Sequence, residues 1–321
     1  MAPRRRDYFF TFTILGLAAS LLMSFQYIGG TLYSLADMWI MNQEAGGLRW
    51  LSWLFHSPWT EILVQYVFVL GAAYPLIALM LRRIPKDMRR GRLLSLEDFT
   101  VCLAAAMGLG YAFNIIGNCI NLFFSLLSGR SVLDMNPVMD MVSELSPSMI
   151  IYACFLGPFM EELMFRGMLL KRARLFGDRT AVIFTSLLFG LMHGNLTQFL
   201  YASAIGMVLG YVAVKTNSIR YTVPMHVAIN SFGMAVAGGE SLLEDAGLYG
   251  GLFLYDLAFL AAIIFLIIGA AVILWKYGPL WLGQLAWNNG YPSPYRKYVY
   301  LNPGFFLYLG ICLAEMVSYL F

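Results

Sequence analysis

Long apolar runs separated by short polar segments dominate this chain of 321 residues. A helix needs about 20 apolar residues to cross the core of a bilayer, and several runs reach that length. Hydrophobic residues make up 60% of the chain and charged residues 12%, which is about half the charged share of a soluble domain. Inside lipid, the backbone polar groups must bond within the chain, so such runs form helices. We therefore expect an all-α fold, a polytopic transmembrane helix bundle.

About eight or nine of these runs are expected to span the membrane. They are residues 8–29, 60–81, 99–127, 148–170, 180–194, 196–214, 221–238, 252–275 and 303–320. The third is long enough to be tilted, broken or extended beyond the membrane, and the fifth is short for a span. We expect residues 1–321 to form one membrane domain, with a core at 148–240, N-terminal helices at 1–147 and C-terminal helices at 241–321.

Lys and Arg gather in alternate loops, which the positive-inside rule assigns to the cytoplasm. Their clusters lie within residues 4–6, 82–92, 171–179, 215–220 and 276–297, whereas the opposite loops carry only Arg49 and Arg130. Every basic residue except Arg166 is accounted for in this way. The net charge of +3 thus reflects topology and favours no nucleic-acid partner. We expect a plasma-membrane protein in contact with lipid, with its N-terminus in the cytoplasm.

Three ionisable residues lie inside the fourth apolar run, where charge is expensive. Glu161, Glu162 and Arg166 follow Gly157 and Pro158. A charge at the centre of a span costs about 2.5–3.5 kcal/mol on insertion scales, so these side chains must face the interior of the bundle. Glu162 and Arg166 share a helix face and can form an ion pair, which leaves Glu161 free. A purely structural ion pair is the alternative, but ionisable residues inside a membrane are usually functional.

Two of the three histidines also fall within apolar runs. His193 ends the run that begins at Phe189, and His226 lies four residues before Asn230. The spacing places the imidazole of His226 and the amide of Asn230 on one helix face. Each histidine could simply bond a neighbouring helix. Together with the two glutamates, however, they suggest a polar cavity inside the membrane.

This set of residues contains what amide hydrolysis requires. Glu161 could act as the base on a water that His193 also holds, while His226 and Asn230 donate hydrogen bonds to the oxyanion. Zinc is the alternative, with Glu161, His193 and His226 as its ligands. The chain has no His-Glu-x-x-His run, and the three ligands would come from three separate helices. We therefore expect no cofactor, with zinc as the alternative.

The three motifs in this order resemble the family of CAAX prenyl proteases and bacteriocin-processing proteins, abbreviated CPBP or Abi. The motifs are Glu161-Glu162-x-x-x-Arg166, Phe189-x-x-x-His193 and His226-x-x-x-Asn230. The resemblance implies a helical membrane bundle with intramembrane endopeptidase activity. It also implies that Glu161 and His193 activate water, that His226 and Asn230 form the oxyanion site, and that Glu162 and Arg166 orient Glu161. The partner would be a peptide or a membrane-protein substrate.

Two other functions remain open at this stage. A catalytically inert immunity or scaffold protein could keep the same fold, although it would be free to lose motif residues. A proton-coupled transporter could use buried Glu and His residues as a relay. The internal repeat and matching broken helices typical of such transporters are absent from the sequence. The motifs therefore favour the protease.

Overall fold

A computed structural model describes residues 4–42, 55, 57–132, 134–137, 146–285 and 294–321. The described part of the chain is helical and contains no strand, which confirms the all-α bundle. The N-terminal half comprises α1 (Arg5–Met41), α3 (Pro58–Phe68), α4 (Tyr74–Leu81) and α5 (Leu96–Ser128). The C-terminal half comprises α7 (Pro147–Ile151), α8 (Gly157–Glu162), α9 (Lys171–Ala173), α10 (Asp178–Leu191), α11 (Leu196–Thr216), α12 (Thr222–Asp245), α13 (Tyr249–Gln284) and α14 (Pro303–Leu320).

Seven helical segments among the described residues are long and apolar enough to cross a membrane. They correspond to seven of the nine predicted spans, and the other two are α10 and α12. With 14 residues, α10 is about 21 Å long at 1.5 Å per residue and falls short of a 30 Å hydrocarbon core. It packs against α11 in the middle of the bundle, so protein rather than lipid surrounds it. Its shortness therefore fits a buried position.

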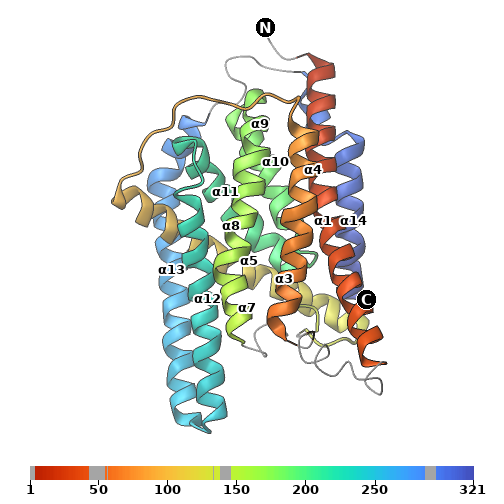
Figure 1. Cartoon of the computed structure of the whole chain (residues 1–321). Helices are drawn as coiled ribbons and strands as arrows, with labels where there is room; N and C mark the ends of the chain where they lie inside the picture. The colour runs from red at the N-terminus through yellow and green to blue at the C-terminus, as the bar shows by residue number, and fades with distance from the viewer. Residues whose placement is uncertain (1–3, 43–54, 56, 133, 138–145, 286–293) are drawn as a thin grey trace.

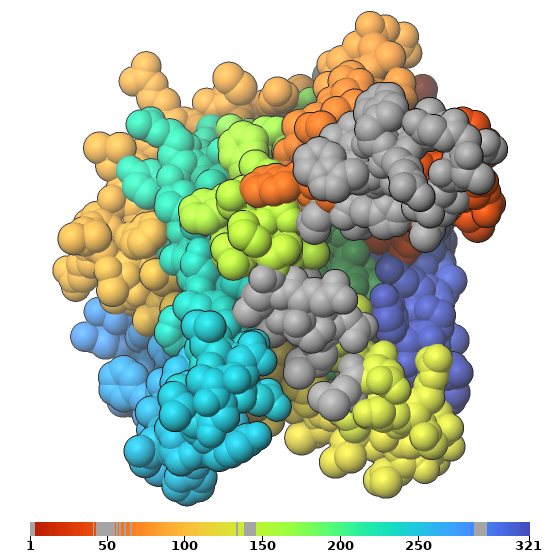
Figure 2. Space-filling view, turned by 60° about the horizontal axis from the view of Figure 1, so that its bottom comes forward, coloured from red at the N-terminus to blue at the C-terminus, as the bar shows by residue number. Residues whose placement is uncertain are grey.

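The helices differ strongly in what surrounds them. In the apolar 18-residue stretch of α11, two-thirds of the residues are buried. In the corresponding stretch of α13 only 6% are buried, which marks α13 as a lipid-facing helix. The third predicted span is the unbroken helix α5, which crosses the bundle obliquely and packs on α11 and α13 (Figure 1). At the end opposite the N-terminus, α12 and α13 form a hairpin that projects from the bundle (Figures 1 and 2).

The loops predicted to face the cytoplasm meet at one end of the bundle, at the top of Figure 1. The amide of Asp87 donates to the carbonyl of Lys171, and the amide of Arg92 donates to that of Lys215. Asn217 in turn donates its side-chain amide to the Arg89 carbonyl. The extended segment 86–92 thus runs across the ends of α9 and α11 and joins three loops that the charge pattern places on one side of the membrane.

Two arginines and two aspartates lock this segment onto α10. Arg89 lies 2.7 Å from both Asp87 and Asp178, and Arg174 lies 3.2 Å from Asp87 and 3.0 Å from Asp178. Burial alone would raise the pKa of Asp87, but hydrogen bonds from Arg89 and the charge of Arg174 outweigh it and lower this pKa below the usual 3.8. The carboxylate of Asp87 therefore stabilises the folded chain in its ionised form.

We expect this contribution to be present above pH 3.8 and to disappear as the pH falls through the depressed pKa of folded Asp87. Its size should be at most about 1 kcal/mol, because Arg89 is half-exposed and solvent screens the pair. Thermal unfolding in detergent between pH 7 and 3 measures the effect. Asp87→Asn should lower the unfolding temperature near neutral pH and flatten the acid dependence relative to the parent. Parallel curves for the two proteins would contradict this assignment.

A glycine allows α10 and α11 to approach closely beside the motif residues. A Cβ atom at Gly190 would lie 2.5 Å from the carbonyl oxygen of Phe199 and would overlap the Ser203 hydroxyl. We expect Gly190→Ala to destabilise the fold by about 1–3 kcal/mol, because backbone would have to shift. Gly269→Ala on lipid-facing α13 is the matched control, since no atom lies within 4 Å of its added methyl. Denaturant titration of both variants measures the difference, and equal stabilities would refute the close approach.

Candidate active site

The fourth predicted span is a helix broken by wider π-helical turns, at Tyr152–Leu156 and at Leu163–Leu170. In the first turn the amide of Gly157 bonds the carbonyl of Tyr152 instead of the carbonyl of Ala153. Pro158 has no amide hydrogen to replace that bond. The Ala153 carbonyl therefore accepts from the side chain of Asn230 at 2.9 Å. The break anchors α12 to the glutamate-bearing helix, in keeping with the frequent occurrence of π turns at functional sites.

Glu162 and Arg166 form the ion pair that their spacing predicts. Their side chains are 0% and 1% exposed, and the guanidinium lies 2.8 Å from the carboxylate. Arg166 also donates to the carbonyl of Gly206 on α11 at 3.3 Å, where a Cβ atom would approach its guanidinium to 3.2 Å. Breaking a fully buried pair leaves one charge uncompensated, which costs about 3–5 kcal/mol. This pair therefore fixes the helix next to Glu161.

His226 lies between the two glutamates. Its Nδ1 is 3.2 Å from Glu162 Oε1, and its Nε2 is 3.7 Å from Glu161 Oε2. The carboxylate of Glu162 accepts from Arg166 as well, so it acts as an ionised acceptor and Nδ1 of His226 carries the proton. Glu162 thus fixes the ring orientation of His226, in addition to the role toward Glu161 that the family resemblance implies.

His193 follows the end of α10 and is held by a backbone carbonyl. Its Nδ1 lies 3.0 Å from the carbonyl oxygen of Phe189, which can only accept, so Nδ1 carries the proton and Nε2 is left for chemistry. The next two residues fix the turn: Gly194 adopts a positive φ of 64°, and Asn195 caps α11 while donating to the His193 carbonyl. From α14, Glu315 packs directly on Gly194, where a Cβ atom would overlap its carboxyl group.

The Phe189 ring joins the parts of the site. Its ring makes edge contacts with both imidazoles, at centroid distances of 5.3 Å to His193 and 5.6 Å to His226. The guanidinium of Arg166 lies over its face at 4.3 Å, a favourable cation–π position. Phe189 is 1% exposed, and Phe165 packs against its ring. A single aromatic side chain therefore sets the spacing between the two histidines and the buried arginine.

The structure brings the predicted site residues together from three helices. Glu161, Glu162 and Arg166 come from the broken helix, Phe189 and His193 from α10 and the turn after it, and His226 and Asn230 from α12. Glu161 is partly exposed, unlike Glu162. Glu161 contacts His226 but makes no direct ion pair with His193. A bridging molecule such as water would be needed to connect Glu161 with His193.

The arrangement does not form a three-ligand metal site. Both histidines direct Nδ1 to an acceptor, as metal-bound histidines commonly do. Within the described residues, however, no three His, Cys, Asp or Glu side chains are grouped closely enough to hold a metal ion. The Glu161, His193 and His226 set would have to move together to bind zinc. The chemistry below is therefore derived from the side chains alone.

Two tyrosines beside the site were not predicted from the sequence. Tyr74 on α4 donates its hydroxyl to the carbonyl of Met160 at 2.6 Å, which pins α4 to the residue before Glu161. Tyr66 on α3 packs edge-on against Tyr152 in the first π turn, with ring centroids 6.3 Å apart. Neither tyrosine belongs to a motif. The sequence marks them only as two hydroxyl-bearing residues, eight positions apart in an apolar run.

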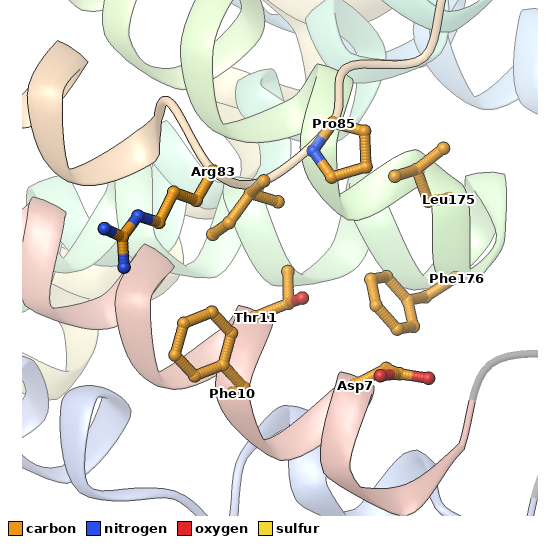
Figure 3. Close-up of a pocket in the computed structure, with 8 residues that line it drawn as sticks. Asp7, Phe10, Thr11, Arg83, Pro85, Leu175 and Phe176 are labelled. Carbon is orange, nitrogen blue, oxygen red and sulfur yellow. The ribbon is translucent and has the colours of Figure 1, made fainter.

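A cavity opens at the predicted cytoplasmic end, away from these residues (Figure 3). It has a volume of about 250 Å³, and its walls come from α1, the segment after α4 and the chain before α10. Asp7, Thr11, Arg83 and Phe176 are among its lining residues, and no predicted site residue is. A polar cavity around Glu161 therefore stays a prediction.

The comparisons with known proteins agree with the motifs. Residues 143–232 match the family model described as type II CAAX prenyl endopeptidase Rce1-like. The resemblance inferred from the three motifs is thus confirmed, and the matched segment contains Glu161, His193, His226 and Asn230.

A bacterial relative gives a second match. The chain is 26% identical over 176 residues to a putative membrane peptidase, YdiL, of Bacillus subtilis strain 168. The match covers 50% of this chain and 66% of that protein, just under two-thirds of its length. No solved structure matches the chain significantly.

Proposed function

We propose that this protein is an intramembrane endopeptidase of the CAAX-protease type that hydrolyses a peptide bond with water activated by Glu161 and His193. The observation that carries the proposal is the buried network in which Arg166 neutralises Glu162 and leaves Glu161 beside His226, with no Arg or Lys partner among the described residues. A purely structural ion pair needs one glutamate. The second glutamate, partly exposed and facing an imidazole, has the position of a reacting group.

In the proposed reaction, water lies between Glu161 and the Nε2 atom of His193. Glu161 takes a proton from the water as its oxygen bonds to the peptide carbonyl carbon, and the carbonyl electron pair moves onto oxygen. When the tetrahedral intermediate collapses, the C–N bond breaks and Glu161 returns the proton to the leaving amine. Each proton and electron pair is accounted for without a metal.

His226 and Asn230 would stabilise the oxyanion. Their contacts within the protein determine which hydrogens each can still donate to the substrate. Asn230 uses one amide hydrogen on Ala153 and retains the second for substrate. His226 commits its Nδ1 proton to Glu162, so Nε2 donates only when the ring carries a second proton. The Glu161 carboxylate lies 3.7 Å from that nitrogen. Removal of one such donor typically lowers the rate about 10²–10³-fold.

Three alternatives to this function yield different measurements. An inert immunity or scaffold protein would cleave nothing in any membrane, and its fold would tolerate loss of Glu161. A zinc-dependent peptidase would copurify with about one zinc ion per chain and would lose its activity to a chelator. A proton-coupled transporter would acidify or alkalinise the lumen of vesicles when a solute is added.

The first test is cleavage by the purified full chain in phosphatidylcholine–phosphatidylglycerol vesicles. A library of synthetic peptides, with and without a farnesylated C-terminal Cys-a-a-X segment, serves as the probe, and mass spectrometry reads the products. Metal content and the effect of a chelator are measured on the same preparation. Chelator-resistant cleavage supports the glutamate mechanism and chelator-sensitive cleavage supports zinc. Absence of cleavage in vesicles and in detergent rejects the peptidase.

A further inference from the structure

A buried hydroxyl group lies close to the candidate site but outside the segment 143–232 that matches the family model. Tyr66 lies on α3, one turn before the π-helical turn Val69–Ala73 that separates α3 from α4. Its hydroxyl oxygen is inaccessible to solvent and has no hydrogen-bond partner among the described residues. An unsatisfied buried hydroxyl costs about 1–3 kcal/mol. Such groups are rare in folded proteins and call for an explanation.

Tyr66 is connected to the candidate site through Tyr152 and lies near Glu161. Its ring meets Tyr152 edge-on at 6.3 Å, and the next residue, Ala153, accepts the hydrogen bond from Asn230. Glu161 is close enough to act electrostatically on both Tyr66 and Tyr74. The hydroxyl of Tyr74 already donates a hydrogen bond to the carbonyl oxygen of Met160. Of these two tyrosines, Tyr66 therefore has the hydroxyl that is free to bind a substrate.

The predicted oxyanion site is short of donors. Asn230 has one amide hydrogen to offer, and Nε2 of His226 faces the Glu161 carboxylate as well as the substrate. A phenol is protonated throughout the neutral range and donates one hydrogen bond. The aromatic rings of Tyr66 and Tyr152 would also line the substrate path with apolar surface, as suits a membrane-borne peptide.

We propose that Tyr66 is a catalytic residue whose hydroxyl donates a hydrogen bond to the oxyanion of the tetrahedral intermediate, beside the Asn230 amide. The inference rests on the proposed peptidase function. Tyr66 transfers no proton in this step: water adds to the carbonyl carbon, its proton goes to Glu161, and the Tyr66 O–H bond stays intact. The carbonyl oxygen gains charge in the transition state, so the hydrogen bond strengthens there and acts on kcat.

The test is Tyr66→Phe, which removes only the hydroxyl. We expect kcat to fall about 10²-fold with little change in KM, on the best peptide from the library described above. The unfolding temperature should stay equal or rise, since an unsatisfied polar atom is lost. Tyr74→Phe is the matched contrast, because it removes a hydroxyl that is bonded in the fold and should lower the unfolding temperature. Tyr249→Phe, at an exposed position, should change neither quantity.

The results separate this inference from the function on which it rests. If the parent cleaves peptide and Tyr66→Phe matches its kcat, Tyr66 is no catalytic residue and the peptidase stands. If Tyr66→Phe unfolds at a lower temperature, its hydroxyl has a structural partner and the inference is overturned. If the parent and Glu161→Gln are equally inactive on every peptide, the peptidase itself is rejected and the inference falls with it.

Discussion

Replacing Glu161 with glutamine should abolish most peptide cleavage while leaving the fold intact. Glutamine keeps the size of the side chain but cannot accept a proton from water, so we expect kcat to fall about 10²–10⁴-fold, the usual share of a general base. Glu161 is only partly buried, and its one ion-pair contact within the described residues is with His226. The free energy of unfolding should therefore change by less than about 0.5 kcal/mol, as for surface substitutions.

The assay compares product formation by the parent, by Glu161→Gln and by Glu240→Gln in the same vesicles. Glu240 lies exposed near the far end of α12, so its substitution controls for loss of one negative charge. Circular dichroism and thermal unfolding show whether each variant is folded. Cleavage by folded Glu161→Gln at the parental rate would eliminate Glu161 as the base and direct attention to His193.

Spacing along the sequence was sufficient where the contact lies within one helix. Glu162 and Arg166 are four residues apart, and they form the predicted pair. The apolar runs likewise predicted the helices, because burying about 20 residues in lipid leaves the backbone no other solution. The order of motifs then identified the family core. The ion pair depends on helix spacing, the spans on the length of apolar runs and the family on motif order. The sequence displays all three directly.

Contacts between helices could not be predicted in the same way. Asn230 and Ala153 are 77 residues apart, and their bond depends on a carbonyl that the π turn and Pro158 leave free. Glu315 lies in no motif, yet it packs on Gly194 beside His193. Tyr66 lies in no motif. Such contacts follow from the packing of whole helices, and individual sequence positions give little indication of that packing.

The structure also separates two tasks that the motif Glu161-Glu162-x-x-x-Arg166 combines. Glu162 is fully buried and bonds Arg166 and His226, whereas Glu161 is partly exposed and has no arginine partner in the part of the chain that the structure describes. One carboxylate is therefore paired with Arg166 inside the bundle, and the other is the one to which the proposed mechanism assigns the reaction. Adjacent residues on a helix point about 100° apart, which is why two consecutive glutamates can face such different surroundings.

Loss of Arg166 should consequently destabilise the protein more than any other single substitution proposed above. Arg166→Met leaves the Glu162 carboxylate, which is 0% exposed, without its counter-charge. We expect the free energy of unfolding to fall by about 3–5 kcal/mol. Unfolding in mixed micelles, followed by circular dichroism as the fraction of denaturing detergent rises, measures the change.

The double variant Glu162→Gln with Arg166→Met distinguishes an unpaired charge from lost packing. It removes both charges and keeps an acceptor for Nδ1 of His226, so it should recover most of the lost stability, as neutral replacements of buried pairs often do. A double variant as unstable as Arg166→Met would show that packing of the arginine on Phe189, rather than charge, holds this region. Recovered stability without recovered cleavage would mean that the pair serves catalysis by orienting His226, since the fold can then be built without either charge.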